Sequence, residues 1–327
     1  GPALNAMNAA VNLIASNNAT VAEARTIDAF TNSGANTYGI SDAIATFIDA
    51  TPSNQVEINA AVEAASGTVT ATGNATVAQA EVVSALTKAV VYSVSDTSAN
   101  IEGASAAALN EAVDVASTGV STVAQANAVM AATNSGTTTV ATVTDTAANV
   151  LNLTTGSNDV VTNVNVSDVV NATTANAIVA LDTGANITNT VVFADISDTS
   201  ANIATVAIAT LGAATYVSVT KSMSIAEYTT LADAVTISVI PNIGQPVYTW
   251  TLTDTFTNLA VKSNNVNFDH MTALNYAAHV TIIDTLTIAQ ADLVDQIGSV
   301  SYNIQDNDAN IVAALNGNNS SENALLF

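Results

Sequence analysis

The chain has no cysteine, very few basic residues and few aromatic ones, and each scarcity excludes a class of protein. Without thiols it can form neither a disulfide nor an iron–sulfur centre. Its Lys and Arg residues number four against 27 acids, which gives a formal net charge of −23. These four residues are scattered: Arg25, Lys88, Lys221 and Lys262. A surface this acidic repels phosphate backbones, which excludes nucleic-acid binding.

Long apolar runs are missing as well. No stretch approaches the roughly 18–20 apolar residues that span a bilayer, so we expect no membrane insertion. Hydrophobic residues nevertheless make up 49% of the chain and aromatic residues only 4%, so most of the apolar content is small side chains. These residues recur periodically, which is typical of a folded chain.

One ten-residue phrase recurs six times, each time with an aspartate at its fifth position, as in YSVSDTSANI at 92–101. We call these six residues the marker aspartates. They are Asp42, Asp96, Asp145, Asp198, Asp254 and Asp306, spaced 49 to 56 residues apart. A period near 50 held along the chain is far more specific than any short motif, and it predicts a repeat architecture.

The residues before each marker aspartate alternate with the period of a strand, and an apolar residue returns five positions after it. We therefore expect each marker aspartate to lie where a strand ends and a helical turn begins, and to cap exposed amides there. The residue four positions on is asparagine in five copies, and we interpret it as a hydrogen-bonding position stacked between repeats. These residues are Thr46, Asn100, Asn149, Asn202, Asn258 and Asn310.

A second phrase alternates with the first, as in NATVAQAEVV from Asn74. In five of its six copies Thr or Ser is followed three residues later by Glu or Gln, which is a capping box at a helix start. The pairs are Thr20/Glu23, Thr76/Gln79, Thr122/Gln125, Ser224/Glu227 and Thr287/Gln290, and the degenerate copy has Thr173/Asn176. Apolar residues behind each box recur at helical spacing, so the phrase predicts short amphipathic helices.

Each period therefore contains two half-repeats, each a strand followed by a helix. Strand–helix units of fixed length place their strands parallel and wind right-handed. The fold class is α/β, and we predict a right-handed solenoid with a parallel sheet like that of leucine-rich repeats. About 12 strands stacked roughly 4.8 Å apart in one sheet give a body on the order of 50 Å long. The abundant Ala, Val and Thr permit such close stacking.

The predicted organisation along the chain is simple. Residues 1–2 look like the scar of a tag-cleaving protease, and residues 3–315 form a single array of about six repeats. A variable insertion is expected near 231–267, where Pro, Gly and Trp cluster and the spacing is longest. Residues 316–327 are expected to form a C-terminal tail.

The sequence contains no nucleophile elbow, phosphate-binding loop, dinucleotide fingerprint or zinc motif. His270 and His279 lie near Asp269 and Asp284, but no third ligand is spaced to join them. We therefore predict that the chain is not an enzyme and binds no cofactor. The cation left for consideration is Ca²⁺, and its best candidates are the alternating oxygen side chains of Asp306, Asp308 and Asn310. They lack the glycine and glutamate of an EF-hand loop, and capping is the stronger interpretation of the aspartates.

Two further surfaces each allow two interpretations. Tyr38, Tyr92, Trp250 and Tyr302 form an aromatic column that could stack sugars, but the favoured interpretation is a core position whose hydroxyls reach water. The threonines at 137–139 could belong to a flat ice-binding array, although threonine is also an ordinary strand residue.

The phrases SDTSANI and TDTAANV, followed by TVAQA, resemble the tandem repeats of very large secreted cell-surface proteins of Gram-negative bacteria and cyanobacteria. Such repeats often lie near RTX-type calcium-binding or type I secretion segments. The resemblance implies an extracellular location at the bacterial cell surface and a role as a stalk, adhesin or surface-layer-like module. It brings no catalytic residues, and the glycine- and aspartate-rich nonapeptides of calcium rolls are absent from this chain.

These lines lead to one functional expectation and one alternative. We expect a structural or adhesive repeat module whose partners are neighbouring repeats of the same large protein, surface glycans or other cells. The alternative is an extracellular module that binds glycans or calcium through the variable segment 240–280.

Overall fold

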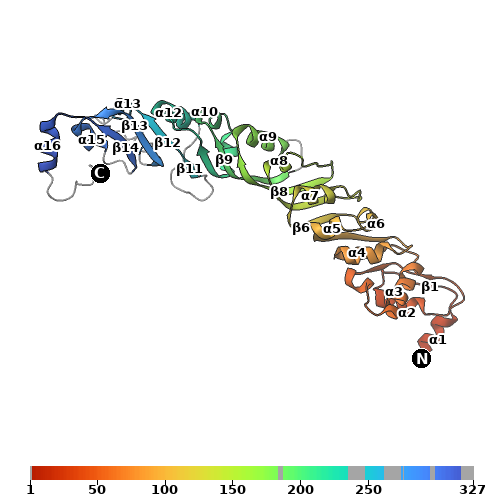
Figure 1. Cartoon of the computed structure of the whole chain (residues 1–327). Helices are drawn as coiled ribbons and strands as arrows, with labels where there is room; N and C mark the ends of the chain where they lie inside the picture. The colour runs from red at the N-terminus through yellow and green to blue at the C-terminus, as the bar shows by residue number, and fades with distance from the viewer. Residues whose placement is uncertain are drawn as a thin grey trace. The chain divides into compact units, whose positions relative to one another are not determined.

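The computed structural model describes residues 2–182, 187–234, 247–260, 274, 276–294 and 299–317, and it is a mixed α/β protein with a long parallel sheet. The chain divides into two compact units. Unit 1 contains Gly1–Asn165 and Leu181–Thr190, and unit 2 contains Val166–Ala180 and Val191–Phe327. The division passes through one helix and the two strands that flank it, and Figure 1 shows the elements of both units.

The main sheet has nine strands in the order β11-β10-β9-β8-β7-β6-β5-β4-β3, so each strand lies beside the next one in the sequence. The pairings with a defined register are parallel, as the alternating strand and helix phrases predict. The strands are β3 Ile40–Ala43, β4 Val69–Ala75, β5 Val90–Thr97, β6 Val115–Ser121, β7 Thr138–Asp145, β8 Asp159–Val170, β9 Ile187–Asp198, β10 Ala214–Val219 and β11 Val247–Thr249.

Two smaller parallel sheets continue this pattern within their own units. In unit 1, β1 pairs with β2, and in unit 2 the order is β12-β13-β14. Their strands are β1 Leu13–Ile14, β2 Asn36–Thr37, β12 Thr251–Asp254, β13 His279–Leu286 and β14 Val300–Ile304. The prediction of about 12 strands in one sheet is therefore wrong for the described residues, because two strands are interrupted. Only Tyr38 and Gly39 separate β2 from β3, and only Trp250 separates β11 from β12.

A helical segment follows almost every strand and returns the chain to the start of the next one. In unit 1 these are α1 Pro2–Ala9, α2 Val21–Asp28, the 3-10 helix η1 Ile44–Phe47, α3 Pro52–Ala64, α4 Val77–Ser84, α5 Ser98–Glu102, α6 Ala106–Asn110, α7 Val123–Met130 and α8 Ala147–Val150. In unit 2 they are α10 Ser200–Ile203, α11 Ile208–Gly212, α12 Ile225–Ala234, α13 Phe256–Ala260, α15 Ile288–Val294 and α16 Asp308–Gly317, and α9 Ala172–Asp182 reaches from unit 2 into unit 1. Helices of neighbouring half-repeats pack together, as α10 does with α12 along one side of unit 2 (Figure 1).

The helices of the second phrase begin where their capping boxes lie. The Thr76 hydroxyl accepts the Gln79 N–H at 3.3 Å, while the Gln79 side chain accepts the Thr76 N–H at 3.0 Å. The same reciprocal pair begins α2, α7, α12 and α15 at Thr20, Thr122, Ser224 and Thr287. In the degenerate copy the cap is Asn171, whose side chain accepts the Thr174 N–H at 2.8 Å, so Thr173 is not the capping residue.

The core consists of small and branched side chains in corresponding positions of successive half-repeats. Two residues before each marker aspartate, the first five copies carry an apolar side chain that is no more than 1% exposed: Ile40, Val94, Val143, Ile196 and Leu252. In the helices of the second phrase, four copies bury an alanine completely: Ala24, Ala80, Ala126 and Ala175. Such small residues let the helices approach closely, which suits a stack of similar layers.

Beside the predicted variable region, larger side chains enlarge the core. Tyr228 stands where the other helices have alanine, and its ring packs against Trp250 with 5.6 Å between the ring centroids. About half of the predicted insertion near 231–267, residues 235–246 and 261–267, lies outside the described residues. So do Gly1 and residues 318–327, which include most of the predicted tail.

Candidate functional site

The marker aspartates are the most regular polar feature of the described chain, and Asp96 shows how they act. Its Oδ1 accepts the N–H of the next residue, Thr97, at 2.7 Å, which caps the turn where β5 ends. Its Oδ2 accepts the N–H of Val77 at 2.9 Å. Val77 is the first residue of α4 in the preceding half-repeat, so one carboxylate joins two successive layers.

All six marker aspartates make this pair of bonds. Each Oδ2 lies 2.9–3.1 Å from the first amide of the preceding helix, at Val21, Val77, Val123, Ala172, Ile225 and Ile288. Each Oδ1 lies 2.7–2.8 Å from the amide of the next residue. The first amides of a helix have no partner within it, and the helix dipole favours a negative charge there. The sequence pattern indicates the cap on the following turn, and the bond to the preceding half-repeat is a second role that it does not reveal.

The asparagine four residues after the marker aspartate supports the same carboxylate. Asn100 donates its side-chain amide to Asp96 Oδ1 at 2.7 Å, and Asn149, Asn202, Asn258 and Asn310 make the equivalent bond. The interpretation of these asparagines as contacts between repeats is wrong, because their partner lies within their own turn. In the first copy the Thr46 hydroxyl donates to the Ala43 carbonyl instead.

The hydrogen bonds lower the pKa of five marker aspartates. Burial would raise the pKa of Asp96, but bonds from Val77 N–H, the Asn100 side chain and Thr97 N–H outweigh it. For Asp145 the bond from the Asn149 side chain is the largest cause of the lowered pKa. The pKa values of Asp198, Asp254 and Asp306 are lowered by the same kinds of bond. These carboxylates therefore stay ionised at neutral pH, the form in which both oxygens accept.

At other turns, hydrogen bonds join half-repeats in the opposite direction to the marker aspartates, which accept from the preceding half-repeat. There a side chain of one layer accepts backbone N–H groups of the layer that follows it. Glu81 accepts the N–H of Ser105, Asn110 that of Thr133, and Asn127 that of Thr154. Sequence reasoning missed these residues because no fixed spacing to a marker aspartate identifies them.

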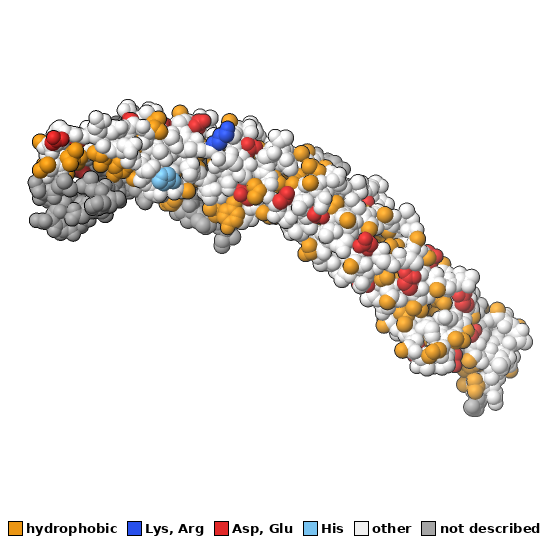
Figure 2. Space-filling model, viewed as in Figure 1, with side chains coloured by type: hydrophobic (Ala, Val, Ile, Leu, Met, Phe, Trp, Pro, Cys, Tyr) orange, Lys and Arg blue, Asp and Glu red, His pale blue; other side chains and the backbone are white. Residues whose placement is uncertain are grey.

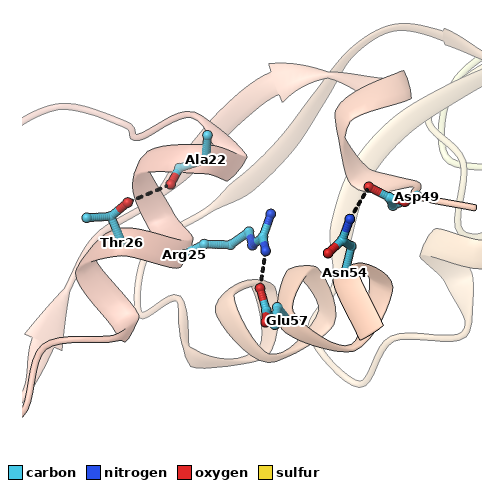
Figure 3. A network of polar contacts seen from close by, with 6 residues as sticks. All are labelled: Ala22, Arg25, Thr26, Asp49, Asn54 and Glu57. Carbon is cyan, nitrogen blue, oxygen red and sulfur yellow. Dashed lines mark hydrogen bonds and ion pairs between the residues drawn. The ribbon is translucent and has the colours of Figure 1, made fainter. Parts of the chain in front are cut away.

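An ion pair also joins two layers. Arg25 of α2 pairs with Glu57 of α3, and Figure 3 shows the two side chains meeting between the helices. Nearby, Asn54 donates to Asp49 at 3.1 Å, which places a second polar pair at the start of α3. One of the four basic residues is thus engaged in packing.

The aromatic column is buried and cannot serve as a sugar platform at its best-defined positions. Tyr38 and Tyr92 are no more than 2% exposed, and their hydroxyls donate to the Ala61 and Ala108 carbonyls at 2.8 and 3.0 Å. The expectation that these hydroxyls reach water is therefore wrong. Burial raises the pKa of both phenols to about 12, so they remain donors.

The threonines at 137–139 do not form a uniform outward array. Thr138 is buried and its hydroxyl donates to the Asn134 side chain at 2.8 Å, while Thr137 donates its N–H and hydroxyl to Asp114. These side chains hold the turn before β7.

Of the three calcium candidates, Asp306 accepts hydrogen bonds at both carboxylate oxygens. Asp306 accepts the N–H groups of Ile288 and Asn307, and Asn310 points its amide nitrogen at Asp306 Oδ1 at 2.8 Å. Asp308 is exposed at the first residue of α16. A cation would need oxygens where this turn presents N–H groups.

The histidine neighbourhood is brought together only in part. His279 lies between the hydroxyls of Ser299 and Ser301, 3.0 Å from each, and Asp284 accepts the Phe256 N–H at 2.7 Å. His270 and Asp269 lie outside the described residues. Within the described ranges, no group of three or more His, Cys, Asp or Glu residues is placed to hold a metal ion.

In the described part of the chain no helix has the length and apolarity needed to cross a bilayer. None of the known protein families matches the chain, and no curated protein or solved structure matches it.

Proposed function

We propose that the chain is a right-handed α/β solenoid that serves as a structural or adhesive repeat module of a secreted bacterial cell-surface protein, acting as a stalk or surface-contact region. The observation that supports this proposal best is the double role of the six marker aspartates. The most regularly recurring residue type joins each layer to the next. A stalk needs successive layers that are joined in this way.

The character of the exposed surface is consistent with the proposal. Acidic side chains are scattered singly over the face seen in Figure 2, among hydrophobic and uncharged polar side chains, and basic side chains are rare. A high net charge of one sign keeps a protein soluble and discourages nonspecific association. An extended surface module benefits from both properties.

Small-angle scattering of the purified chain tests the solenoid. The nine parallel strands of the main sheet, about 4.8 Å apart, predict an elongated particle whose stacking axis is at least on the order of 40 Å long. A particle made of two separate globules would contradict the solenoid. Binding assays with a glycan array and with bacterial cells then distinguish the two proposed roles. Measurable binding supports a surface-contact role, and the absence of binding supports a stalk that makes no contact of its own.

A further inference from the structure

Two kinds of boundary alternate between the layers of unit 1. Each marker aspartate accepts the first amide of the helix in the preceding half-repeat, so a boundary that follows a capping-box helix contains this carboxylate bond. A boundary that follows a marker aspartate depends more on side-chain packing, because both carboxylate oxygens are used elsewhere. The boundaries between β3 and β4 and between β5 and β6 are of this second kind. Across the β5–β6 boundary, α5 packs against α7 (Figure 1).

The core of the β5–β6 boundary contains serine hydroxyls at positions that are apolar in other half-repeats. Ser121, the residue before the cap of α7, is 1% exposed, and its hydroxyl bonds that of Ser98, which is 3% exposed. At the residue before the helix cap, the other five copies carry a buried apolar side chain: Ala19, Ala75, Val170, Met223 and Leu286. In unit 1, the residues two positions after the other marker aspartates are the buried Ile44 and Ala147. One hydrogen bond therefore stands at this boundary in place of an apolar contact.

A third serine on β6 is buried without a partner. Ser117 is 3% exposed, and its hydroxyl has no hydrogen-bond partner among the described residues. The equivalent residue of β4, two positions before the bulge glycine, is Ala71. Burying a hydroxyl that makes no hydrogen bond is unfavourable, whereas burying a methyl group is favourable. The closed state of the β5–β6 boundary is therefore disfavoured relative to an open state in which water reaches Ser117.

The backbone bonds across the two boundaries are alike. At the β3–β4 boundary the Ile40 N–H donates to the Thr68 carbonyl at 2.9 Å. At the β5–β6 boundary the Val94 N–H, two residues before its marker aspartate like that of Ile40, donates to the Asp114 carbonyl at 2.8 Å. Four residue pairs are in register at each boundary. The strand pairing therefore does not offset the difference that the serines make in the core.

We propose that the β5–β6 boundary is a built-in opening point of unit 1, at which two layers separate more readily than at the β3–β4 boundary. Opening there hydrates the hydroxyls of Ser98, Ser117 and Ser121, whereas opening between β3 and β4 exposes apolar side chains to water. Native proteins open locally in this way without unfolding as a whole. In the stalk proposed above, this boundary is the first to extend under force. The opening itself depends on the core serines and not on that role.

Thiol labelling tests the proposal, because the chain has no cysteine and a single introduced thiol reports on one boundary. Val115→Cys on β6 and Val69→Cys on β4 place the thiol at equivalent residues that are both 0% exposed. Under native conditions a disulfide reagent reaches a buried thiol through the open state, so the labelling rate measures how often that boundary opens. We expect Val115→Cys to be labelled about tenfold faster than Val69→Cys at equal reagent concentration.

Second substitutions show whether the buried hydroxyls are the cause. Ser117→Ala in the Val115→Cys chain removes the hydroxyl without a partner and should slow labelling about tenfold. Ala71→Ser in the Val69→Cys chain introduces a hydroxyl at the equivalent place and should speed labelling by a similar factor. Ser95→Ala, at a half-buried residue of β5, is the matched control and should leave the labelling of Val115→Cys unchanged.

Hydrogen exchange of the wild-type chain gives the same comparison without any substitution. The Val94 N–H should exchange faster than the Ile40 N–H, since each amide bonds across its own boundary. Circular dichroism melts establish that each thiol variant is folded, and the exchange measurement decides the question if one of them is not. Equal labelling of the two thiols in folded variants would overturn the proposal, as would slower exchange at Val94 than at Ile40. Labelling that does not respond to Ser117→Ala would overturn it as well.

Discussion

The half-repeat that contains β8 and α9 differs from the two similar ones that contain β4 and β6. Both β4 and β6 have seven residues with the same order of buried and exposed side chains. Each contains a glycine at positive φ, Gly73 at 80° and Gly119 at 78°, where the ladder to the next strand shifts register. In contrast, β8 runs for 12 residues and has no such glycine, and Asn171 caps the helix that follows it.

One bond is the same in all three half-repeats. The first amide of the helix donates to a marker aspartate in the next layer, with Asp198 accepting from Ala172 at 3.1 Å even where the bulge and the capping box are lost. The turn before the helix can therefore vary, whereas the carboxylate between layers recurs. The carboxylate bond, the glycine bulge and the capping box can each be removed separately by mutation.

The largest effect is expected from deleting one whole repeat in phase. Removing residues 77–122 joins Thr76 to Val123, which exchanges one capping-box helix for another and lets Asp145 replace Asp96. Because layers contact mainly their neighbours, the product should fold and melt cooperatively. A shorter deletion, residues 77–110, leaves β4 running into β6 without a helix and should abolish cooperative folding. If the two deletions behave alike in thermal melts, the correspondence between half-repeats is wrong.

The next effect concerns the carboxylate. Asp96→Ala should lower the free energy of unfolding by about 0.5–2 kcal/mol, as expected for the loss of a helix cap. Asp96→Asn should lower the free energy of unfolding nearly as much. An amide has only one oxygen, so its NH₂ must face either the Val77 N–H or the Thr97 N–H, and that N–H loses its acceptor. Glu102→Gln removes the same charge from an exposed residue of α5 and is the control. Urea unfolding measures all three, and equal stability of Asp96→Ala and wild type would refute the capping role.

How much of this fold and of these bonds follows from the sequence depends on the range of each contact. The helix starts and the cap at Thr97 lie within a few residues of their partners, so the local pattern indicates them. The bond from Val77 to Asp96 joins two layers, and it depends on how the layers stack. Asn100 bonds Asp96 within its own turn and the Tyr92 hydroxyl bonds the Ala108 carbonyl within its own half-repeat, so the predictions for both residues are wrong although their partners are local.

Replacing the glycine of a β-bulge should lower the free energy of unfolding less than removing the marker carboxylate. Gly119→Ala places a side chain on a residue with φ of 78°, which costs about 1 kcal/mol even though nothing lies within 4 Å of the added Cβ. Gly212→Ala at the end of α11 also meets open space, and its φ is not in that range, so it should be neutral or slightly stabilising. Urea unfolding of the two variants separates backbone strain from crowding. Equal stabilities would show that the bulge tolerates an L-residue.

The effect of pH on stability is expected to be smaller than that of the glycine substitution, and to occur only at acidic pH. The folded pKa of Asp96 is lowered from an ordinary value near 3.8, so its ionised form stabilises the folded state above that value. This contribution is lost as the pH falls below about 4 toward the folded pKa. The difference in melting temperature between wild type and Asp96→Asn should therefore narrow from pH 6 to pH 3. A difference that widens on acidification would mean that the folded pKa is raised.

Calcium should have the smallest effect of all, because the marker aspartates already use both oxygens to accept N–H groups. With −23 net charge, any salt that screens repulsion should raise the melting temperature modestly. A specific site would add RT ln(1 + [L]/Kd) beyond this screening. We expect calcium to exceed sodium only slightly at matched ionic strength, in melts that include a chelator control. A calcium-specific rise above about 10 °C would show that cations replace amides around residues such as Asp306, since a shift of that size needs tight binding to the folded state.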